Sequence, residues 1–139
     1  MSDLIATRSD GATLMMTDQR EYSAWKSLNP IPRDRAWIML YLLREWGYQP
    51  RLNEGKRSKE RQAQLVAEGK SKTLNSDHLT GDAWDICDLA GGWDCTKEFK
   101  RAVGRACRIA GVVWGGQWLS FGPLGDWAHC SWRRGAIVG

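Results

Sequence analysis

Apolar residues recur at helical spacing in four stretches of the chain, and each stretch has residues at its ends that favour a helix boundary. Asp18, Ser58 and Thr96 stand where a side-chain oxygen can cap a first turn, and Gly47 and Gly69 stand where glycine commonly ends a helix. Residues 29–32 carry two prolines, so we expect them to break the chain between the first two helices. The predicted helices cover residues 18–28, 33–46, 58–68 and 96–110.

Short apolar stretches with strand character follow in the second half of the chain. They cover residues 82–88, 112–114 and 127–132, and residues 48–52 form an earlier extended segment in which Pro50 favours an edge strand. Residues 1–17 look irregular, with a turn signal at residues 9–11. Because helices come first, strands cluster later and no linker interrupts the chain, we predict a single α+β domain over residues 1–139.

The composition is ordinary for a soluble globular protein, with 42% hydrophobic and 26% charged residues. A chain of 139 residues buries enough surface to fold without a disulfide or a structural metal. Nine tryptophans are unusual, and we expect some in the core and others along an aromatic-lined cleft. The net charge of +4 favours polyanionic partners such as nucleic acid, anionic lipid or the bacterial wall, but so mild a charge does not choose among them.

The four cysteines form no recognisable metal-binding pattern, because none belongs to a Cys-x-x-Cys pair. We expect them to be reduced and mostly buried, with Cys130 turned away from the side of the strand that carries His129. Residues 1–16 lack the cationic start and apolar stretch of a secretion signal, and the apolar run at 36–43 is too short to span a bilayer. We therefore expect synthesis in the cytoplasm without a signal peptide, and no membrane insertion.

The two histidines are the candidates for chemistry, because each stands close in sequence to an aspartate and a turn-forming glycine. His78 precedes a turn at Gly81, and the strand that follows brings Asp85 back toward the histidine. Asp85 points inward from a strand of otherwise apolar residues, where a carboxylate needs a metal or a charged partner. With His129 as a third ligand, the set would match a catalytic zinc site, which keeps a fourth position open for water.

Asp126 lies three residues before His129 and is a candidate general base that would take a proton from the zinc-bound water. Residues three apart on a regular strand face opposite sides, so Asp126 can face the metal only from a turn before the strand. Residues 122–125 provide such a turn. A lone histidine is more often a surface or structural residue, and a strand aspartate often faces solvent, so the residues alone leave zinc and these roles equally open.

Two spaced motifs resemble a known family, the zinc D-alanyl-D-alanine carboxypeptidases and L-alanyl-D-glutamate endopeptidases. They read Ser76-x-His78-x-x-Gly81-x-Ala83-x-Asp85 and Asp126-x-x-His129. Two further segments match the family, namely the run Gly55-Lys-Arg57-Ser58-x-x-x-Gln62 with its continuation to Ser71, and Trp114-Gly115-Gly116-x-Trp118. The family includes the VanX and VanY enzymes and several bacteriophage endolysins, and the short endolysins resemble this chain most. The resemblance covers roughly residues 47–130.

The resemblance implies a role for each matching residue. The implied zinc ligands are His78, Asp85 and His129. Asp126 would be the catalytic base, a role that glutamate often fills in the family. Arg57 would bind substrate and stabilise the developing oxyanion, and Ser76 would line the substrate cleft. The implied fold is of the Hedgehog and D,D-peptidase type, a small α+β domain with an antiparallel sheet and flanking helices.

The chain departs from the family's pattern in three respects. After the last histidine the family usually has an aromatic or aliphatic residue and then an acid that orients a ligand, whereas Cys130 and Ser131 stand here. Gln117 replaces the acid of the family's Trp-Gly-Gly-Asp-Trp, and the short tract at 118–126 predicts a cleft that is more open on that side. None of these departures removes an expected zinc ligand.

The function implied by the resemblance is zinc-dependent hydrolysis of peptidoglycan stem peptides, of the L-Ala-D-Glu endopeptidase type. The expected setting is a phage or prophage endolysin that reaches the wall through a holin and acts as a monomer on the peptide substrate, without nucleic acid. Two alternatives keep the same fold: a D-alanyl-D-alanine carboxypeptidase of wall remodelling, and a non-catalytic zinc-bearing wall-binding protein. Nucleic-acid binding through the basic stretch 51–61 is a further alternative, but no recognised motif accompanies it.

Overall fold

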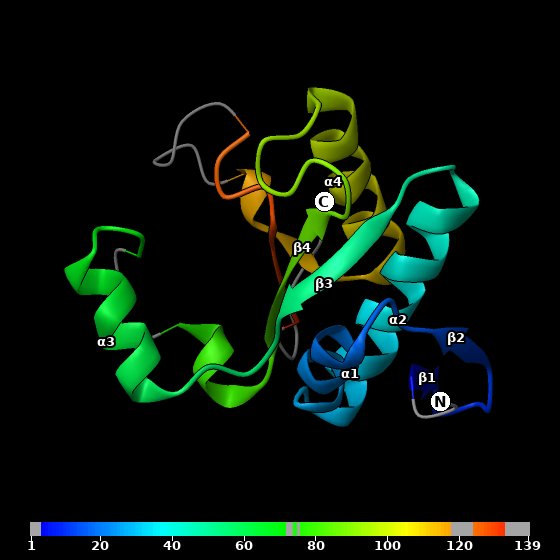
Figure 1. Cartoon of the computed structure of the whole chain (residues 1–139), viewed down its shortest axis with the longest axis horizontal. Helices are drawn as coiled ribbons and strands as arrows, with labels where there is room; N and C mark the ends of the chain where they lie inside the picture. The colour runs from blue at the N-terminus through cyan, green and yellow to red at the C-terminus, as the bar shows by residue number, and fades with distance from the viewer. Residues whose placement is uncertain (1–3, 72–73, 75, 118–123, 133–139) are drawn as a thin grey trace.

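The computed structural model describes residues 4–71, 74, 76–117 and 124–132, and its centre is an antiparallel sheet with the strand order β3-β4-β6-β5. The strands are β3 (Pro50–Glu54), β4 (Ala83–Asp88), β5 (Val113–Trp114) and β6 (His129–Ser131). The helices are α1 (Gln19–Lys26), α2 (Pro30–Glu45), α3 (Lys59–Ala67) and α4 (Lys97–Ala110), with short 3₁₀ helices η2 (Asp77–Thr80) and η3 (Gly115–Gln117) (Figure 1). The predicted α+β class, with an antiparallel sheet and flanking helices, is confirmed.

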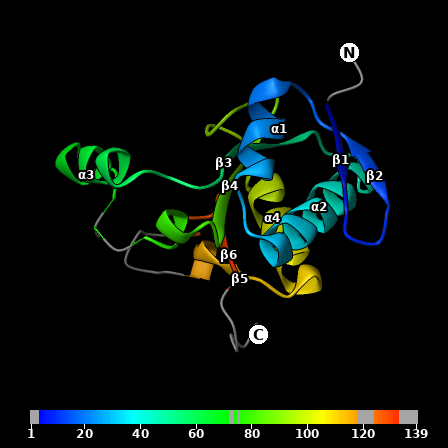
Figure 2. The ribbon, with the colours of Figure 1, turned by 90° about the horizontal axis from the view of Figure 1, so that it is seen from below.

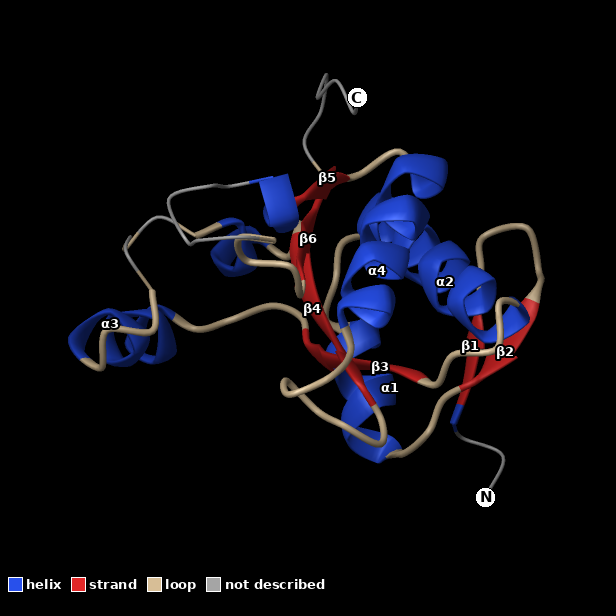
Figure 3. Ribbon diagram, turned by 90° about the horizontal axis from the view of Figure 1, so that it is seen from above, coloured by secondary structure: helices blue, strands red, loops and turns tan. Residues whose placement is uncertain are grey.

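The helices cover the two sides of the sheet unequally. Figure 3 shows α2 and α4 together on one side of β4, β6 and β5, whereas α3 stands away from the other side, and Figure 2 shows the same separation from below. The side that faces α3 is therefore the less covered face of the sheet.

Within the described residues no helix is both long and apolar enough to cross a lipid bilayer.

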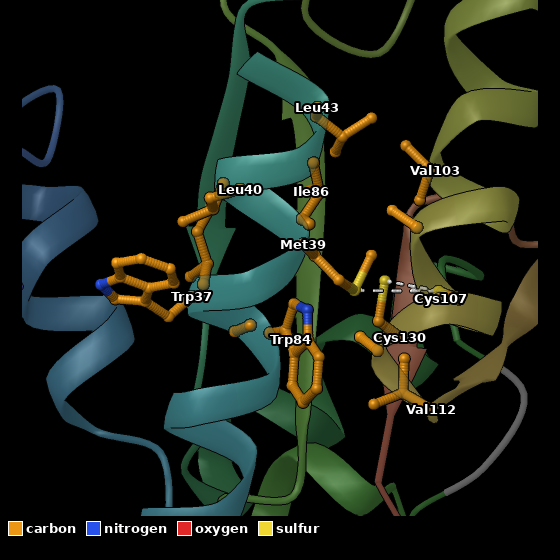
Figure 4. Close-up of a cluster of buried hydrophobic side chains, with 14 of the residues drawn as sticks. Trp37, Met39, Leu40, Leu43, Trp84, Ile86, Val103, Cys107, Val112 and Cys130 are labelled. Carbon is orange, nitrogen blue, oxygen red and sulfur yellow. Dashed lines mark hydrogen bonds between the residues drawn. The ribbon is translucent and has the colours of Figure 1, made fainter. Parts of the chain in front are cut away.

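The core fills the space between the sheet and the helix pair α2 and α4. Trp84 and Ile86 of β4 and Cys130 of β6 point toward these helices and have no exposed surface (Figure 4). Because successive side chains of a strand point to opposite faces, Asp85 between Trp84 and Ile86 points toward the α3 side. The core thus fixes which face of the sheet carries the polar residues.

Helix starts were the most predictable local feature, because each depends on one side chain and the next turn of backbone. Asp18 accepts a hydrogen bond from the backbone N–H of Glu21 at 2.8 Å, and Ser58 accepts one from Arg61 at 3.0 Å. Thr96 caps α4 in the same way, through the N–H of Phe99 at 3.1 Å. These three contacts satisfy backbone donors that a helix leaves free at its beginning.

The first two helices are separate, as predicted, but the predicted start of the second helix at residue 33 is wrong, because α2 begins at Pro30 and runs through both prolines. A proline in the first helical turn sacrifices no intrahelical hydrogen bond, since the N–H it lacks would have no helical partner there. Asn29 makes no capping bond to α2 and instead donates its amide to the carbonyl of Thr80 at 2.8 Å and to Asp82 at 2.9 Å. The start of α2 is therefore tied to the turn between η2 and β4.

The prediction of irregular structure at the N-terminus is also wrong over part of its length. Residues Ile5–Thr7 (β1) and Thr13–Met15 (β2) pair as an antiparallel hairpin, turned by Gly11 at a φ of 93°. The hairpin is held on α2, where the indole N–H of Trp37 donates to the carbonyl of Ala6 at 3.1 Å. Strands of three residues are too short to show an alternating pattern, so the sequence carried no periodic signal for them.

Candidate metal centre

The sheet register brings two of the predicted ligands together. Asp85 of β4 pairs directly with His129 of β6, so both side chains lie on the face turned away from the core. His78 lies on η2, and Gly81 ends this 3₁₀ helix at a φ of 83°, which lets the chain return along β4. The three residues predicted as ligands are therefore neighbours in space, although 51 positions separate the two histidines.

The donor atoms converge on one point. Nε2 of His78 lies 3.4 Å from Oδ1 of Asp85, and Nδ1 of His129 lies 3.7 Å from the same oxygen. All three donor atoms lie within 4.8 Å of one another, and the imidazole rings meet edge to face with centroids 5.0 Å apart. Ligands at about 2.0–2.1 Å from a tetrahedral zinc are spaced by roughly 3.3 Å, so only a small adjustment would close this set around the ion.

A backbone contact fixes the orientation and tautomer of His78. Its Nδ1 lies 2.8 Å from the carbonyl oxygen of Gly55, and because a carbonyl only accepts, Nδ1 must donate its proton. In the neutral ring Nε2 then presents a lone pair, and this buried atom has no hydrogen-bond partner within the described residues. A buried lone pair facing a carboxylate needs a cation between them. The two nitrogens and one carboxylate are a donor set that suits Zn²⁺.

The charges around the centre are strongly coupled. Burial raises the pKa of Asp85, but the attraction of His78, His129 and Arg57 outweighs it and leaves the pKa below its ordinary value. Burial lowers the pKa of His78, but the charge of Asp85 outweighs it and leaves that pKa raised. For His129 burial dominates and lowers the pKa to about 4. The centre therefore holds Asp85 ionised and His129 neutral, the protonation states that bind metal.

Asp126 lies in the turn that precedes β6, as its predicted role requires. Its N–H donates to the carbonyl of Gly115 at 2.9 Å, and its own carbonyl accepts from the N–H of His129 at 3.0 Å. Leu124 and Gly125 in this turn have φ values of 63° and 47°. Burial, and then the negative charge of Asp85, raise the pKa of the Asp126 carboxyl to about 6. A carboxyl with such a pKa can both take up and release a proton near neutral pH.

The contacts of Gly115 give a physical reason for the Trp-Gly-Gly motif, which had none in the sequence analysis. A Cβ at this position would stand 3.0 Å from Cβ of His129 and 3.2 Å from Cβ of Asp126, and closer still to the carbonyl oxygen of Asp126. No side chain fits there unless the turn with Asp126 moves. Trp114 secures the same turn from the other side, because its indole N–H donates to the carbonyl of Trp127 at 2.8 Å. Trp118 of the motif, and Gly122 and Pro123 of the predicted turn, lie outside the described residues.

Arg57 is placed beside the centre, and only 9% of its surface is exposed. Its Nη2 approaches Oδ2 of Asp85 at 3.5 Å, and Nη1 donates to Oε1 of Gln62 at 2.7 Å. Nε donates to Glu54 at 3.0 Å, and Nη2 forms a salt bridge with the same carboxylate. Glu54 was missed by the sequence analysis, and Gln62 was matched to the family motif without a role. The guanidinium therefore holds Asp85 in place from the side opposite to the histidines.

Ser76 and Cys130 take positions that bear on the two histidines. The hydroxyl oxygen of Ser76 accepts the backbone N–H of His78 at 3.2 Å and caps η2, so it fixes the turn that carries this histidine. Cys130 lies on the core side with its sulfur 3.5 Å from that of Cys107, and thus points away from the face with His129, as expected. The predicted role of Ser76 in the substrate cleft stays a prediction.

Comparisons with known proteins agree with this geometry. Neither a protein-family profile nor a curated protein sequence matches the chain. Among solved structures, the L-Ala D-Glu endopeptidase ChiX of Serratia marcescens matches with a TM-score of 0.64 and 30% identity, over 86% of this chain and 90% of ChiX.

Two more distant structures share the fold. A variant of the vancomycin resistance D,D-pentapeptidase VanY in complex with Zn(II) matches with a TM-score of 0.56 and 19% identity, over 92% of this chain and 77% of VanY. The L,D-carboxypeptidase DacB from Streptococcus pneumonia matches with a TM-score of 0.59 and 20% identity, over 76% of this chain and 66% of DacB.

The fold and the three-residue centre define a class, the small α+β domains of the architecture that VanY and ChiX share. Identity of 30% over nine-tenths of ChiX narrows the class further. The chain belongs to the family of ChiX, the L-Ala D-Glu endopeptidase of Serratia marcescens.

Proposed function

We propose that this protein is a zinc metallopeptidase that hydrolyses peptidoglycan stem peptides at the bond between L-Ala and D-Glu. The observation that carries the proposal is the convergence of His78, Asp85 and His129 within 4.8 Å, with the half-buried carboxyl of Asp126 in the adjoining turn. Membership of the ChiX family supports the choice of bond, because ChiX is an L-Ala D-Glu endopeptidase.

His78, Asp85 and His129 would hold the ion. Zn²⁺ at such a centre acts as a Lewis acid on the scissile carbonyl and brings the pKa of a bound water to about 7. The Asp126 carboxylate takes a proton from the attacking water and then delivers it to the nitrogen of the leaving amine. Its raised pKa, about 6, makes the second transfer easier than it would be from an ordinary aspartic acid.

Arg57 has two tasks in the proposed mechanism. Its Nη2 holds Asp85 in the orientation that the centre needs, and the remaining N–H of Nη1 is the group we assign to the substrate carbonyl oxygen, where negative charge develops. Ser76 would contact the peptide at the edge of η2, in addition to capping that helix. Both substrate contacts come from the family resemblance and are open to direct test.

The bond is identified by mass spectrometry of purified peptidoglycan after digestion by the zinc-loaded protein. The proposal expects peptides that begin with a free D-Glu amino group, and none from a His78→Ala variant. Release of free D-Ala in place of such peptides would assign the D-alanyl-D-alanine carboxypeptidase activity. Binding of the zinc-loaded protein to peptidoglycan without release of any product would assign a non-catalytic wall-binding protein.

We further propose that the protein serves as a phage or prophage endolysin, made in the cytoplasm and released to the wall by a holin. The net charge of +4 supports this setting because the bacterial wall is anionic, and the family resemblance to short endolysins points the same way. Expression with a holin should lyse bacterial cells within minutes of membrane opening, whereas expression with the holin alone should only stop growth. Equal turbidity loss in both cultures would refute the endolysin role.

A further inference from the structure

A recess lies along α4, on the other side of the sheet from the candidate metal centre. Its volume is about 190 Å³, and Arg101, Arg105 and Arg108 of α4 line it together with Trp114 and Gln117. Trp114 pairs across β5 and β6 with Cys130, which points into the core, so the indole is on the α4 side. The recess is thus separate from the face that carries Asp85 and His129.

The wall formed by Trp114 is rigid. Its indole packs between two glycines, Gly104 of α4 and Gly116 of η3. A Cβ on Gly104 would stand 2.7 Å from the six-membered ring, and one on Gly116 would stand closer still. The indole N–H is used in the bond to the carbonyl of Trp127. Two glycines in contact with one ring fix the position of this wall, so the recess is preformed in the fold.

Within the described part of the chain, no acidic side chain balances the charge in the recess. Arg101, Arg105 and Arg108 occur at intervals of four and three residues, which places them on one face of the helix. No acidic side chain lines the recess, and none of the three forms a salt bridge in the described ranges 4–71, 74, 76–117 and 124–132. By contrast, Arg51 is paired with Asp18 at 2.8 Å.

Like charges at these spacings repel one another on a helix, so this arrangement does not stabilise α4. Arg105 is held in position by Trp46, whose ring centre lies 5.2 Å from its guanidinium carbon. Together these features describe a preformed cationic recess that is suited to an anionic ligand.

We propose that this recess binds a phosphate group, as carried by a phosphodiester-linked anionic polymer of the cell envelope. Guanidinium groups match phosphate oxygens with paired hydrogen bonds, and they recur wherever proteins recognise phosphate. A volume of 190 Å³ is smaller than the roughly 300–1,000 Å³ of pockets for drug-sized ligands, so it suits one phosphate with its ester carbons. The site would anchor the protein on such a polymer independently of the peptide that it cleaves.

Isothermal titration calorimetry of the zinc-loaded protein tests the site with inorganic phosphate, glycerol phosphate and a poly(glycerol phosphate) of defined length. The test variant carries Arg105→Gln and Arg108→Gln, and the control carries Arg20→Gln and Lys26→Gln, which remove the same charge from exposed positions on α1. A third variant, Gly104→Ala, displaces Trp114 without a change of charge. Each measurement is repeated with acetate and with duplex DNA.

We expect glycerol phosphate to bind with a Kd that rises at least tenfold in the double-arginine variant and less than twofold in the control. Gly104→Ala should also weaken it, because a preformed site needs its wall, whereas a diffuse cationic surface does not. The polymer should bind more tightly than the monomer. The proposal is overturned if control and test variants lose affinity equally, if acetate binds as tightly as phosphate, or if only DNA depends on the two arginines. If the Kd for inorganic phosphate is the same in all three variants as in the wild type, phosphate binds elsewhere, and the proposed site is refuted.

Discussion

Gly115 lies against both Asp126 and His129, with no room for a side chain. We predict that the variant Gly115→Ala loses activity but still folds. The added methyl group would meet Cβ of His129 at 3.0 Å, whereas ordinary contacts begin at 3.4 Å, so the neighbouring turn must move by at least 0.4 Å. The contact with the Asp126 carbonyl is tighter, so that residue moves further. The φ of Gly115 is not in the left-handed region, so alanine adds no backbone strain of its own.

The expected magnitudes follow from this displacement. Overpacking of this kind costs about 1–3 kcal/mol of unfolding free energy. A misplacement approaching 1 Å of a group that transfers protons lowers a rate by about 10²-fold. We therefore expect kcat for release of amino groups from peptidoglycan to fall by about two orders of magnitude, while the protein still folds and still binds one zinc at saturating metal.

Gly47→Ala is the matched control for this experiment. Gly47 ends α2 at a φ of 91° with no atom within 4 Å of the position of a Cβ, so alanine costs about 1 kcal/mol through backbone strain alone. It should lower the unfolding temperature and leave kcat unchanged. Our reasoning about Gly115 is refuted if Gly115→Ala keeps more than half of the wild-type kcat, or if Gly47→Ala loses activity to the same degree.

Three further predictions concern the charged groups of the centre. Asp126→Asn should reduce kcat by 10²-fold or more and keep one zinc per chain by metal analysis, and loss of the metal would instead make Asp126 a structural residue. Arg57→Lys should lower both kcat and the unfolding temperature, because a compact ammonium lacks the planar fork with which the guanidinium reaches Glu54, Gln62 and Asp85. An unchanged kcat would remove Arg57 from the mechanism. Zinc affinity, measured by competition with a fluorescent chelator, should fall up to tenfold per pH unit below the raised pKa of His78, because a proton must leave the ring before the metal binds. A zinc affinity that stays the same between pH 8 and pH 5.5 would contradict this.

The parts of the fold that depend on local chemistry were predictable from the sequence. Asp18, Ser58 and Thr96 cap their helices through backbone groups three residues away, so the signal and the contact lie in the same short segment. Strand alternation correctly placed Asp85 on the face opposite Trp84 and Ile86, and Cys130 on the face opposite His129. The expectation that Asp85 points inward is wrong, because Trp84 and Ile86 carry the core face of β4.

Other features depend on contacts between distant segments, which no local pattern encodes. The tautomer of His78 is set by the carbonyl of Gly55, 23 positions earlier, which a sequence motif cannot show. Glu54 became part of the site only through its contact with Arg57, and its acidic side chain had no distinguishing neighbour in the sequence. Pro30 was misread because its effect depends on whether it stands within a helix or at its first position.

The resemblance singled out the candidate metal ligands more sharply than the residues alone could, since histidines and aspartates at such spacings often have only structural roles. The structure adds a physical reason for two of the matched glycines. Gly115 allows the Asp126 turn to approach, and Gly116 admits the ring of Trp114. These are close-packing requirements, so they explain why glycines occupy both places.

The most direct test of the central claim is to follow the release of free amino groups from purified peptidoglycan as zinc is added back to chelator-treated protein. The account predicts negligible release without metal and a linear rise in rate that saturates at one Zn²⁺ per chain, with no recovery in His78→Ala or Asp85→Ala. Full activity in the metal-free protein, or one tightly bound zinc per chain with no release of amino groups, would contradict it.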